Sequence, residues 1–190
     1  MRSALRIIIF VLVMGTASGT LLIGINGFTS VQIARNEELG LKSSVLDVLE
    51  IAYQKDTILE LFEKNIEVLQ KDKFTFYRSP DQAVAFEFSG PGLWGPIRGI
   101  ISINPDLKTV RVLKILHQEE TPGLGARIAE KEYLAQFRHK TIIPKLIFMP
   151  QGRAKSDNQV DAITGATGSS KALEKLLNET IQKNIGILKG

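Results

Sequence analysis

The longest apolar stretch of the chain lies close to its N-terminus. Residues 7–25 contain no charged side chain and are dominated by isoleucine, leucine and valine. In a helix this stretch extends roughly 28 Å, which is close to the hydrocarbon thickness of a bilayer. Arg2 and Arg6 precede it, whereas the next basic residue is Arg35, and this bias favours a cytoplasmic N-terminus. We therefore expect residues 1–28 to form a cytoplasmic N-terminus followed by a transmembrane helix.

A cleaved signal peptide is the alternative interpretation of the same stretch. Residues 15–19 are mostly small, as in a cleavage region, but the apolar run resumes at residues 21–25 and favours an anchor. Gly15 and Gly19 also have the spacing that lets two transmembrane helices pack closely. Since glycine is common in membrane spans, this spacing is compatible with a partner helix without requiring one.

Two helical patterns follow the apolar stretch. Residues 30–52 carry leucine and valine near helical spacing, and residues 57–71 carry a second apolar face. Asp56 or Thr57 is a suitable N-cap for the second helix. These patterns predict a helical connecting region over residues 29–72.

Beyond residue 72 the helical spacing of apolar residues ends, and the residue types become typical of β-strands. Residues 104–106, with the sequence Asn-Pro-Asp, predict a turn between two of the strands. The expected strands are residues 74–77, 83–88, 97–103 and 109–116, with shorter ones at 145–148 and 160–163. Helical patterns cover residues 129–138 and 169–185. The predicted fold class is α+β, with a twisted, mainly antiparallel sheet and flanking helices.

The composition narrows the classes of function. The chain has 190 residues, of which 44% are hydrophobic and 23% charged, as in a globular protein with one full core. Its net charge of +4 is small, and no long lysine or arginine cluster indicates a nucleic-acid partner. The absence of cysteine excludes disulfides, thiolate metal sites and cysteine-ligated iron–sulfur clusters.

No pattern in the sequence indicates hydrolytic catalysis or a metal site. His117 and His139 are the two histidines, and neither has a second ligand at metal-binding spacing. We expect both to be structural or solvent-exposed. Because no nucleophile–base constellation is recognisable either, we predict no catalytic residue, and the candidate chemistry rests on loops that could hold a cofactor.

Three glycine-containing loops lie between the predicted elements. Residues 89–96 hold three glycines, two prolines and the single tryptophan, Trp94, so the backbone there can approach a flat ligand. Taken alone, Trp94 is more simply a hydrophobic plug over the sheet. Residues 119–125 combine a hydroxyl, a Pro-Gly turn and exposed backbone amides, and taken alone they form a routine turn.

The third loop, residues 161–167, leads into the last predicted helix. Taken alone, Thr164 or Thr167 is an N-cap of that helix. A threonine hydroxyl beside Gly165 and Ala166 is also well placed to hold a phosphate, because small residues leave room and a helix N-terminus stabilises negative charge. The loop by itself leaves both interpretations open.

In this order and spacing, the three loops resemble the motifs of a known family. Residues 92–97 (GLWGPI), 120–125 (ETPGLG) and 161–167 (DAITGAT) are similar to those of the FMN-binding domain family, found in the G subunit of the Rnf complex and the C subunit of the sodium-pumping NADH:quinone reductase. The likeness extends over most of the chain. It implies FMN as the cofactor, joined by a phosphoester bond to Thr167. Residues 168–170 (GSS) depart from the family's usual β-branched residue and Thr-Ser, which loosens the helix start but leaves the attachment hydroxyl in place.

The resemblance also assigns the remaining cofactor contacts. Asp161 belongs either to a motif read by a separate flavin transferase, which takes FMN from FAD with Mg²⁺, or to a turn in which it caps nearby amides. Leu93 and Trp94 would cover the flavin ring, and the second loop would bring backbone donors to its pyrimidine edge. The residues expected to bind FMN beside Thr167 are Thr164, Gly165, Ala166, Leu93, Trp94, Thr121, Gly123 and Leu124.

These implications give an expected function. Residues 73–190 would be the FMN-binding domain of a membrane-anchored electron-transfer subunit, on the extracytoplasmic side of the cell membrane. We expect an ion-translocating ferredoxin:NAD oxidoreductase of the Rnf type, with its other membrane subunits as partners, because the chain has little insertion beyond the core domain. The C subunit of a sodium-translocating NADH:quinone reductase is the alternative within this class. A membrane-tethered FMN-binding sensory module without electron transfer is the alternative from another class.

Overall fold

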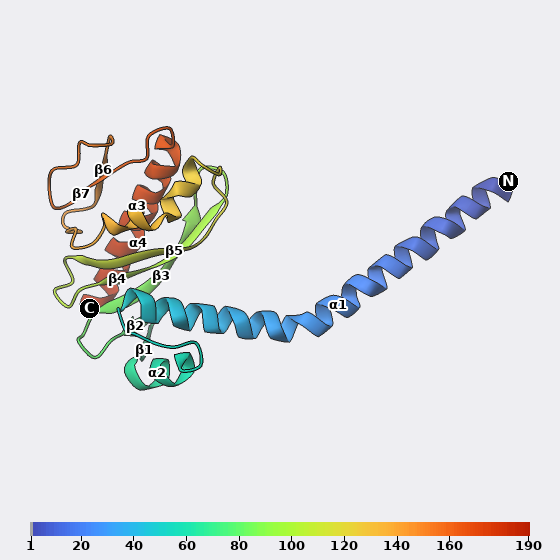
Figure 1. The fold of residues 1–190 in the computed structure, drawn as a ribbon, viewed down its shortest axis with the longest axis horizontal. Coiled ribbons are helices and arrows are strands. Elements are labelled where there is room, and N and C mark those ends of the chain that lie inside the picture. Colours follow the sequence, from blue (N-terminus) through green and yellow to red (C-terminus); the bar gives the residue numbers. More distant parts are fainter. Residues whose placement is uncertain (1) are drawn as a thin grey trace. The chain divides into compact units, whose positions relative to one another are not determined.

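The computed structural model describes residues 2–190, and the chain falls into two units, residues 1–41 and 42–190 (Figure 1). Helix α1 (Arg2–Val48) makes up the first unit and ends in the second. The helical stretches predicted over residues 7–25 and 30–52 form one continuous helix, which ends at Val48. No proline lies between the two patterns, and single glycines are tolerated inside a helix at a modest cost.

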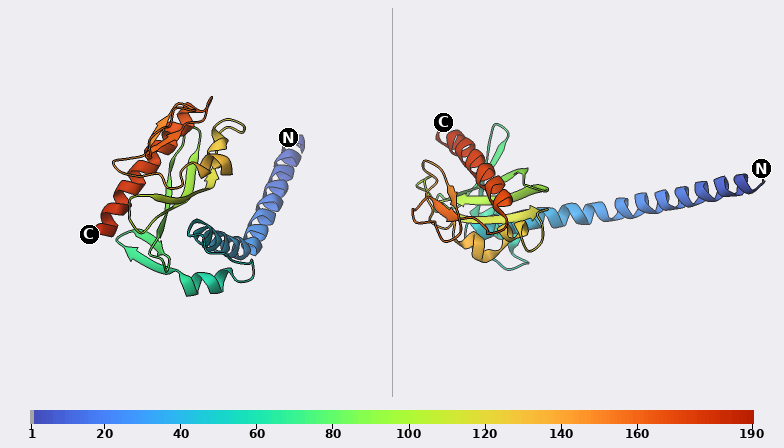
Figure 2. Two further views of the ribbon diagram at one scale, coloured as in Figure 1. Left: turned by 60° about the vertical axis from the view of Figure 1, so that its left-hand side comes forward. Right: turned by 90° about the horizontal axis from the view of Figure 1, so that it is seen from above.

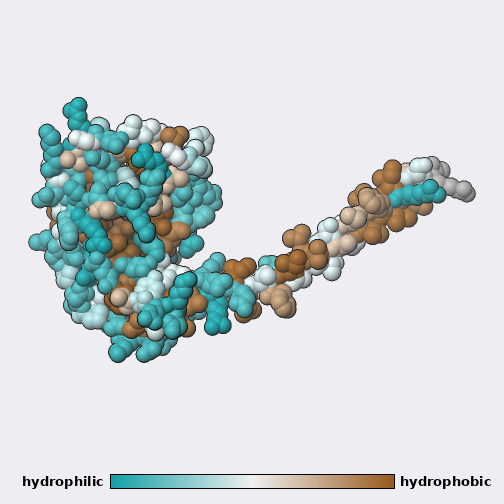
Figure 3. All heavy atoms as spheres, in the orientation of Figure 1, coloured by the Kyte–Doolittle hydropathy of each residue, from teal (hydrophilic) through white to brown (hydrophobic). Residues whose placement is uncertain are grey.

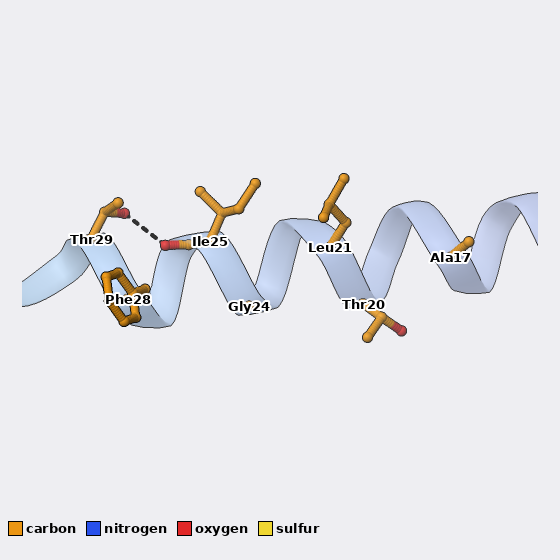
Figure 4. A pocket seen from close by; sticks show the side chains of 7 residues that line it. All are labelled: Ala17, Thr20, Leu21, Gly24, Ile25, Phe28 and Thr29. Carbon is orange, nitrogen blue, oxygen red and sulfur yellow. Dashed lines mark hydrogen bonds between the residues drawn. The ribbon is translucent and has the colours of Figure 1, made fainter.

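The N-terminal part of α1 has the length and composition of a membrane-crossing helix, the one such helix within residues 2–190. Apolar side chains line this part of the helix (Figure 3). One of its faces carries a shallow groove over Ala17 and Gly24, bordered by Leu21 and Phe28 (Figure 4). The hydroxyl of Thr29 donates to the carbonyl oxygen one turn earlier, 2.9 Å away, so this polar group is satisfied within the helix.

The second unit is built on a five-stranded antiparallel sheet in which each strand pairs with its neighbour in the sequence. The four strands predicted over residues 74–116 are confirmed, and their ends shift by a few residues. In order, the strands are β1 (Glu67–Lys71), β2 (Phe74–Arg78), β3 (Val84–Pro91), β4 (Pro96–Ile103) and β5 (Val110–Gln118).

Strand β1 lies where the sequence predicted the end of a helix. Helix α2 (Ile58–Asn65) is shorter than expected, because Ile66 is extended, with φ −112° and ψ 118°. The chain then forms β1 and turns back into β2 through Asp72, which has a φ of 55°. β1 is an edge strand with largely exposed side chains, so it has no strand-like apolar alternation. The helix predicted over residues 57–71 therefore extends too far, because it ends at Asn65 and β1 follows.

Helix α4 (Thr167–Lys189) covers one face of the sheet (Figure 2). Phe86 and Ile101 on the sheet and Leu173 and Leu177 on the helix are all buried in the same hydrophobic core. A methyl group at Gly90 would overlap the side chain of Leu176, so β3 and α4 approach closely there. This packing fixes the helix, and with it the position of its first turn.

The opposite face of the sheet packs on α2 and on the last turns of α1. Tyr77 and Ile100 alternate with the residues that face α4 and therefore point to this second face. The rings of Tyr77 and Phe62 meet edge to face with centroids 6.0 Å apart. The hydroxyl of Ser102 donates to the carbonyl oxygen of Val48 at 2.5 Å, so the end of α1 is part of this unit.

Charged residues reinforce the same contact. We call Asp47, Glu50, Arg111, Lys114 and Arg138 the helix joint. Lys114 Nζ lies 2.6 Å from an Asp47 oxygen, and Glu50 pairs with Arg138 at 2.6 Å and with Arg111 at 3.1 Å. The helix joint thus ties the end of α1 to β5 and to the segment that follows α3.

The rest of the unit connects β5 to α4. The helix predicted over residues 129–138 is a 3-10 turn, η1 (Gly125–Ala129), followed by the short helix α3 (Lys131–Ala135). The two short predicted strands are observed as β6 (Ile147–Met149) and β7 (Gln159–Asp161). They pair in parallel, apart from the antiparallel main sheet. The predicted α+β class with a mainly antiparallel sheet is confirmed.

Candidate FMN-binding site

The first motif forms the tight turn between β3 and β4. The amide of Gly92 donates to the carbonyl oxygen of Gly95 at 2.8 Å, which closes the turn. Leu93 and Trp94 sit at its tip and are 54% and 73% exposed. The interpretation of Trp94 as a plug over the sheet is therefore wrong, because a short hairpin tip carries its side chains away from the core.

The second motif forms the turn that leads into η1. The carbonyl oxygen of Thr121 accepts hydrogen bonds from the amides of Leu124 and Ala126, at 3.1 and 3.0 Å. Gly123 has a φ of +74°, a conformation that glycine adopts without strain. The turn leaves the Leu124 side chain 47% exposed. After Leu93 and Trp94, Leu124 is thus a third large apolar side chain presented to solvent at a loop.

The third motif ends at the first turn of α4. Gly165 has a φ of +80° and Ala166 is the N-cap, so Thr167 is the first helical residue. An alanine N-cap has no side-chain acceptor, and the first helical hydrogen bond runs from the Ser170 amide to the Ala166 carbonyl. The amides of residues 167–169 therefore remain open, as at an anion-binding helix N-terminus.

The two threonines of the third motif have different surroundings. The Thr164 hydroxyl donates to the side-chain oxygen of Gln151. The Thr167 side chain is exposed, and its hydroxyl has no hydrogen-bond partner anywhere in residues 2–190. Of the two candidates, only Thr167 offers a free hydroxyl at the start of the helix.

The fold brings the three motifs together. A methyl group at Gly168 would overlap the side chain of Leu93, and one at Gly165 would touch Leu124. The first turn of α4 therefore lies against the tips of both other loops. We call the three segments, residues 92–95, 120–125 and 165–169, the loop cluster.

A buried carboxylate, which the sequence interpretation did not single out, joins the loop cluster. Glu120 is 4% exposed, and one of its oxygens accepts hydrogen bonds from the amides of Leu93 and Trp94, at 2.7 and 3.2 Å. Its other oxygen accepts a hydrogen bond from the hydroxyl of Ser169 at 2.6 Å. The sequence shows Glu120 only as an acidic residue inside a glycine-rich motif. Its hydrogen-bond partners could not be predicted, because they are far away in the sequence.

Thr167 also borders a pocket of about 400 Å³ on the side of β6 and β7. Ser170 and Lys171 line it from α4, and Gln151 lines it from the loop after β6. Lys171 is one turn beyond Thr167 and places a cation on the same side of the helix. The pocket is further lined by Phe148, Met149, Pro150, Ala162, Ile163, Thr164 and Gly165.

Asp161 has a structural role in this arrangement. Its side chain accepts hydrogen bonds from the amides of Arg153 and Ala154, at 3.1 and 3.0 Å. The bond from the Ala154 amide is the largest of several that hold the pKa of Asp161 below its usual value. The turn-capping interpretation is thus confirmed, while a part in recognition by a transferase stays a prediction. His117, also as expected, is exposed and lies 3.2 Å from Glu119.

The residues present fit the two ends of FMN. The phosphate end matches open amides at the N-terminus of a long helix, a free threonine hydroxyl and a lysine one turn away. The ring end matches three large apolar side chains that are exposed in the loop cluster, Leu93, Trp94 and Leu124. Exposed apolar groups gathered at one place indicate a surface that binds something.

Comparisons with known proteins show which family the segment with the three motifs resembles. Residues 92–182, which contain all three motifs, match the FMN-binding domain family. The C subunit of the Na(+)-translocating NADH-quinone reductase from Pasteurella multocida is 34% identical over 95 residues, covering 47% of this chain and 36% of that protein. The G subunit of the ion-translocating oxidoreductase complex from Methanosarcina acetivorans is 33% identical over 90 residues, covering 47% of this chain and 45% of that protein.

A further relative is the G subunit of the proton-translocating ferredoxin:NAD(+) oxidoreductase complex from Clostridium ljungdahlii. It is 30% identical over 92 residues, 48% of each chain, so the aligned segment spans less than half the length of all three relatives. The crystal structure of the C subunit of a Na(+)-translocating NADH-quinone reductase from Parabacteroides distasonis has a TM-score of 0.72 at 21% identity, covering 83% of this chain and 95% of that one. This likeness confirms the fold. Through residues 92–182, slightly less than half of its length, the chain is therefore similar to the FMN-binding domain family.

Proposed function

We propose that the chain is a membrane-anchored electron-transfer protein that holds FMN in phosphoester linkage to Thr167, as one subunit of a larger complex. One observation carries the proposal: the Thr167 hydroxyl is free and exposed at the start of α4, where the loop cluster also presents Leu93 and Leu124. The other threonine of the same motif, Thr164, has its hydroxyl bonded to Gln151.

The chain's own residues would hold the two ends of the cofactor. The open amides of Thr167, Gly168 and Ser169 and the positive end of the α4 dipole would stabilise the phosphodiester charge. Leu93, Trp94 and Leu124 would shield the ring from water. Bound there, FMN would supply reversible uptake and release of electrons, and the protein would tune that chemistry through burial and hydrogen bonding.

Attachment requires a separate enzyme, in keeping with the family resemblance. In the proposed step the Thr167 oxygen forms a bond to the FMN phosphorus of FAD, and the pyrophosphate bond of FAD breaks. AMP leaves, and the threonine proton passes to solvent. Asp161 would take part through recognition, because its carboxylate is occupied in capping the amides of Arg153 and Ala154.

Two kinds of complex are candidates for the whole assembly. The aligned segment is 33% and 30% identical to the two G subunits and 34% identical to the Pasteurella C subunit. The likeness to the two G subunits supports an Rnf-type ion-translocating ferredoxin:NAD oxidoreductase. A C subunit of a sodium-translocating NADH:quinone reductase remains the alternative, supported by the likeness to known C subunits. Co-purification of the full chain from its native membrane would separate the two by the partner subunits recovered.

The apolar part of α1 supports the proposed placement in the membrane. We place the FMN-binding domain within residues 73–190, outside the cytoplasm, because Arg2 and Arg6 flank the apolar stretch on its N-terminal side. Labelling of cysteines introduced on either side of residues 7–25 tests this orientation. The C-terminal cysteine should react with a membrane-impermeant reagent in intact cells, and the N-terminal one should not.

Attachment is tested by co-expressing the full chain with a flavin transferase. The parent and Thr164→Ala should both show in-gel flavin fluorescence and a mass increase of FMN minus water. Thr167→Ala should show neither, because the nucleophilic oxygen is missing. Fluorescence that persists in denatured Thr167→Ala would place the attachment elsewhere.

A further inference from the structure

Glu120 differs from the other carboxylates of the site in its surroundings. It is 4% exposed, and no lysine or arginine in residues 2–190 forms an ion pair with it. Burying a carboxylate is costly unless several donors satisfy it. Such a group persists in a fold when it performs a task that an apolar residue of the same size could not.

The donors that satisfy Glu120 come from two segments of the loop cluster. The amides of Leu93 and Trp94 lie in the β3–β4 turn, and the Ser169 hydroxyl lies in the first turn of α4. These partners are 27, 26 and 49 residues away along the chain. Its own backbone is fixed too, because the Glu120 amide donates to the side-chain oxygen of Gln118 at 2.7 Å.

Two glycines make room for the carboxylate. A methyl group at Gly92 would overlap one Glu120 oxygen, and one at Gly125 would overlap the other oxygen and the Ser169 hydroxyl. The Glu120 side chain is therefore closely packed between these glycines, and this packing restricts it to the observed conformation. A small shift of Glu120 would move the Leu93–Trp94 turn and the start of α4 relative to each other.

We propose that Glu120 is the positioning residue of the site, which holds the Leu93–Trp94 turn at a fixed place relative to Thr167. On this view, which rests on the proposed function, Thr167 provides the tether and Glu120 sets the place of the side chains that cover the ring. Covalent attachment alone leaves a flexible cofactor free to rotate. A fixed apolar cover removes that freedom and keeps the ring in one environment.

Three substitutions in the full chain test this role. Glu120→Ala removes both sets of hydrogen bonds. Glu120→Gln keeps the size and can still accept from the turn amides while its amide group donates to Ser169. Glu119→Ala is the matched control for side-chain contact with the turn, because this 56% exposed carboxylate lies beside Gly95 and, within residues 2–190, forms its ion pair with exposed His117.

The first measurement uses no cofactor. Trp94 is the single tryptophan, so its fluorescence anisotropy reports the mobility of the turn in the unmodified chain in detergent. We expect a drop in Glu120→Ala, and values close to the parent in Glu120→Gln and Glu119→Ala. Ser169→Ala removes one of the hydrogen bonds and should give an intermediate value, so it replaces Glu120→Ala if that variant does not fold.

The second measurement uses the chain modified by a flavin transferase. Glu120→Ala should still gain the mass of FMN minus water, because the Thr167 hydroxyl is untouched, but it should lose the visible circular dichroism of the flavin. Glu120→Gln should retain that signal. A parent chain that gains no FMN would refute the proposed function, while the Trp94 measurement would still decide the role of Glu120.

Two results would overturn the role of Glu120. One is an unchanged Trp94 anisotropy and flavin dichroism in Glu120→Ala, which would show that the turn holds its place without the carboxylate. The other is a Glu120→Gln variant that behaves like Glu120→Ala, because the hydrogen-bond geometry would then not be what matters.

Discussion

The loop cluster and the helix joint fasten distant segments of the same unit in different ways. The helix joint uses full charges of both signs, and four of its five side chains are 36–45% exposed. The loop cluster uses one buried carboxylate, neutral donors and glycines that leave no free space. Water can solvate a charge that loses its partner in the helix joint, whereas a side chain added at a packed glycine of the loop cluster has nowhere to move. The loop cluster should therefore be the region that is less tolerant of added volume.

The largest expected effect is that of added volume in the loop cluster. Gly125→Ala should destabilise the fold by about 1–3 kcal/mol, because the new methyl group would collide with Ser169 and Glu120. Gly186→Ala is the matched control on α4, where nothing lies within 4 Å, and it should be neutral or stabilising by up to about 1 kcal/mol. Denaturant unfolding measures both, and equal stabilities would refute the close packing of the cluster.

A smaller effect is expected from the helix joint. Arg111 lies 3.1 Å from Glu50 and 2.7 Å from Asp81, and these partners are partly exposed. Arg111→Ala should cost about 1 kcal/mol, and salt should shrink the deficit because it screens the lost attraction. Lys175→Ala, which removes an exposed pair with Glu179 on α4, is the control and should cost less. A deficit of Arg111→Ala that is independent of salt would contradict an electrostatic joint.

A third, weaker effect is expected on the stability of the fold at acidic pH. The hydrogen bond from Arg111 holds the pKa of Asp81 at about 2, below its usual 3.8. Since the folded value is the lower one, the stabilisation is complete above about pH 4 and is lost as the pH falls towards 2. Asp81→Asn should thus be slightly less stable at neutral pH and lose less stability between pH 4 and 2. Screening of this half-exposed side chain keeps the effect below about 1 kcal/mol.

The smallest effect on stability is expected at Trp94, which we propose covers the flavin ring. Trp94→Ala should change the free energy of unfolding by no more than about 0.5 kcal/mol, because the side chain is 73% exposed. In the modified chain, however, flavin fluorescence should change, because the ring loses its cover. A large loss of stability would show that Trp94 supports the fold, and the contrast between the two regions would then need another explanation.

The sequence predicted the centre of the sheet well and its edge poorly. β2 to β5 are apolar on one or both faces, because α4 and the end of α1 cover them, and their patterns are local. β1 is exposed and its side chains are largely polar or charged, so only its pairing with β2 makes it a strand. The pairing of β1 with β2 depends on residues outside β1, so the sequence of β1 itself shows no strand pattern.

The site shows the same division. A helix start close to Thr167 was predictable, because small residues followed by a helical period identify such a start. The predicted threonine N-cap was wrong, because Ala166 is the N-cap and Thr167 is the first helical residue. The role of Glu120 was not, because its partners lie 26 to 49 residues away and only the fold brings them together. The exposure of Trp94 was missed for a related reason, since the composition of the turn does not show to which side its tip points.

The most direct test of the central claim is tandem mass spectrometry of the full chain after co-expression with a flavin transferase. We predict that the mass of FMN minus water resides on Thr167. Fragment ions that place this mass on Thr164, Ser169 or Ser170, or an unmodified peptide from a preparation in which a known substrate of the transferase is fully labelled, would contradict the account.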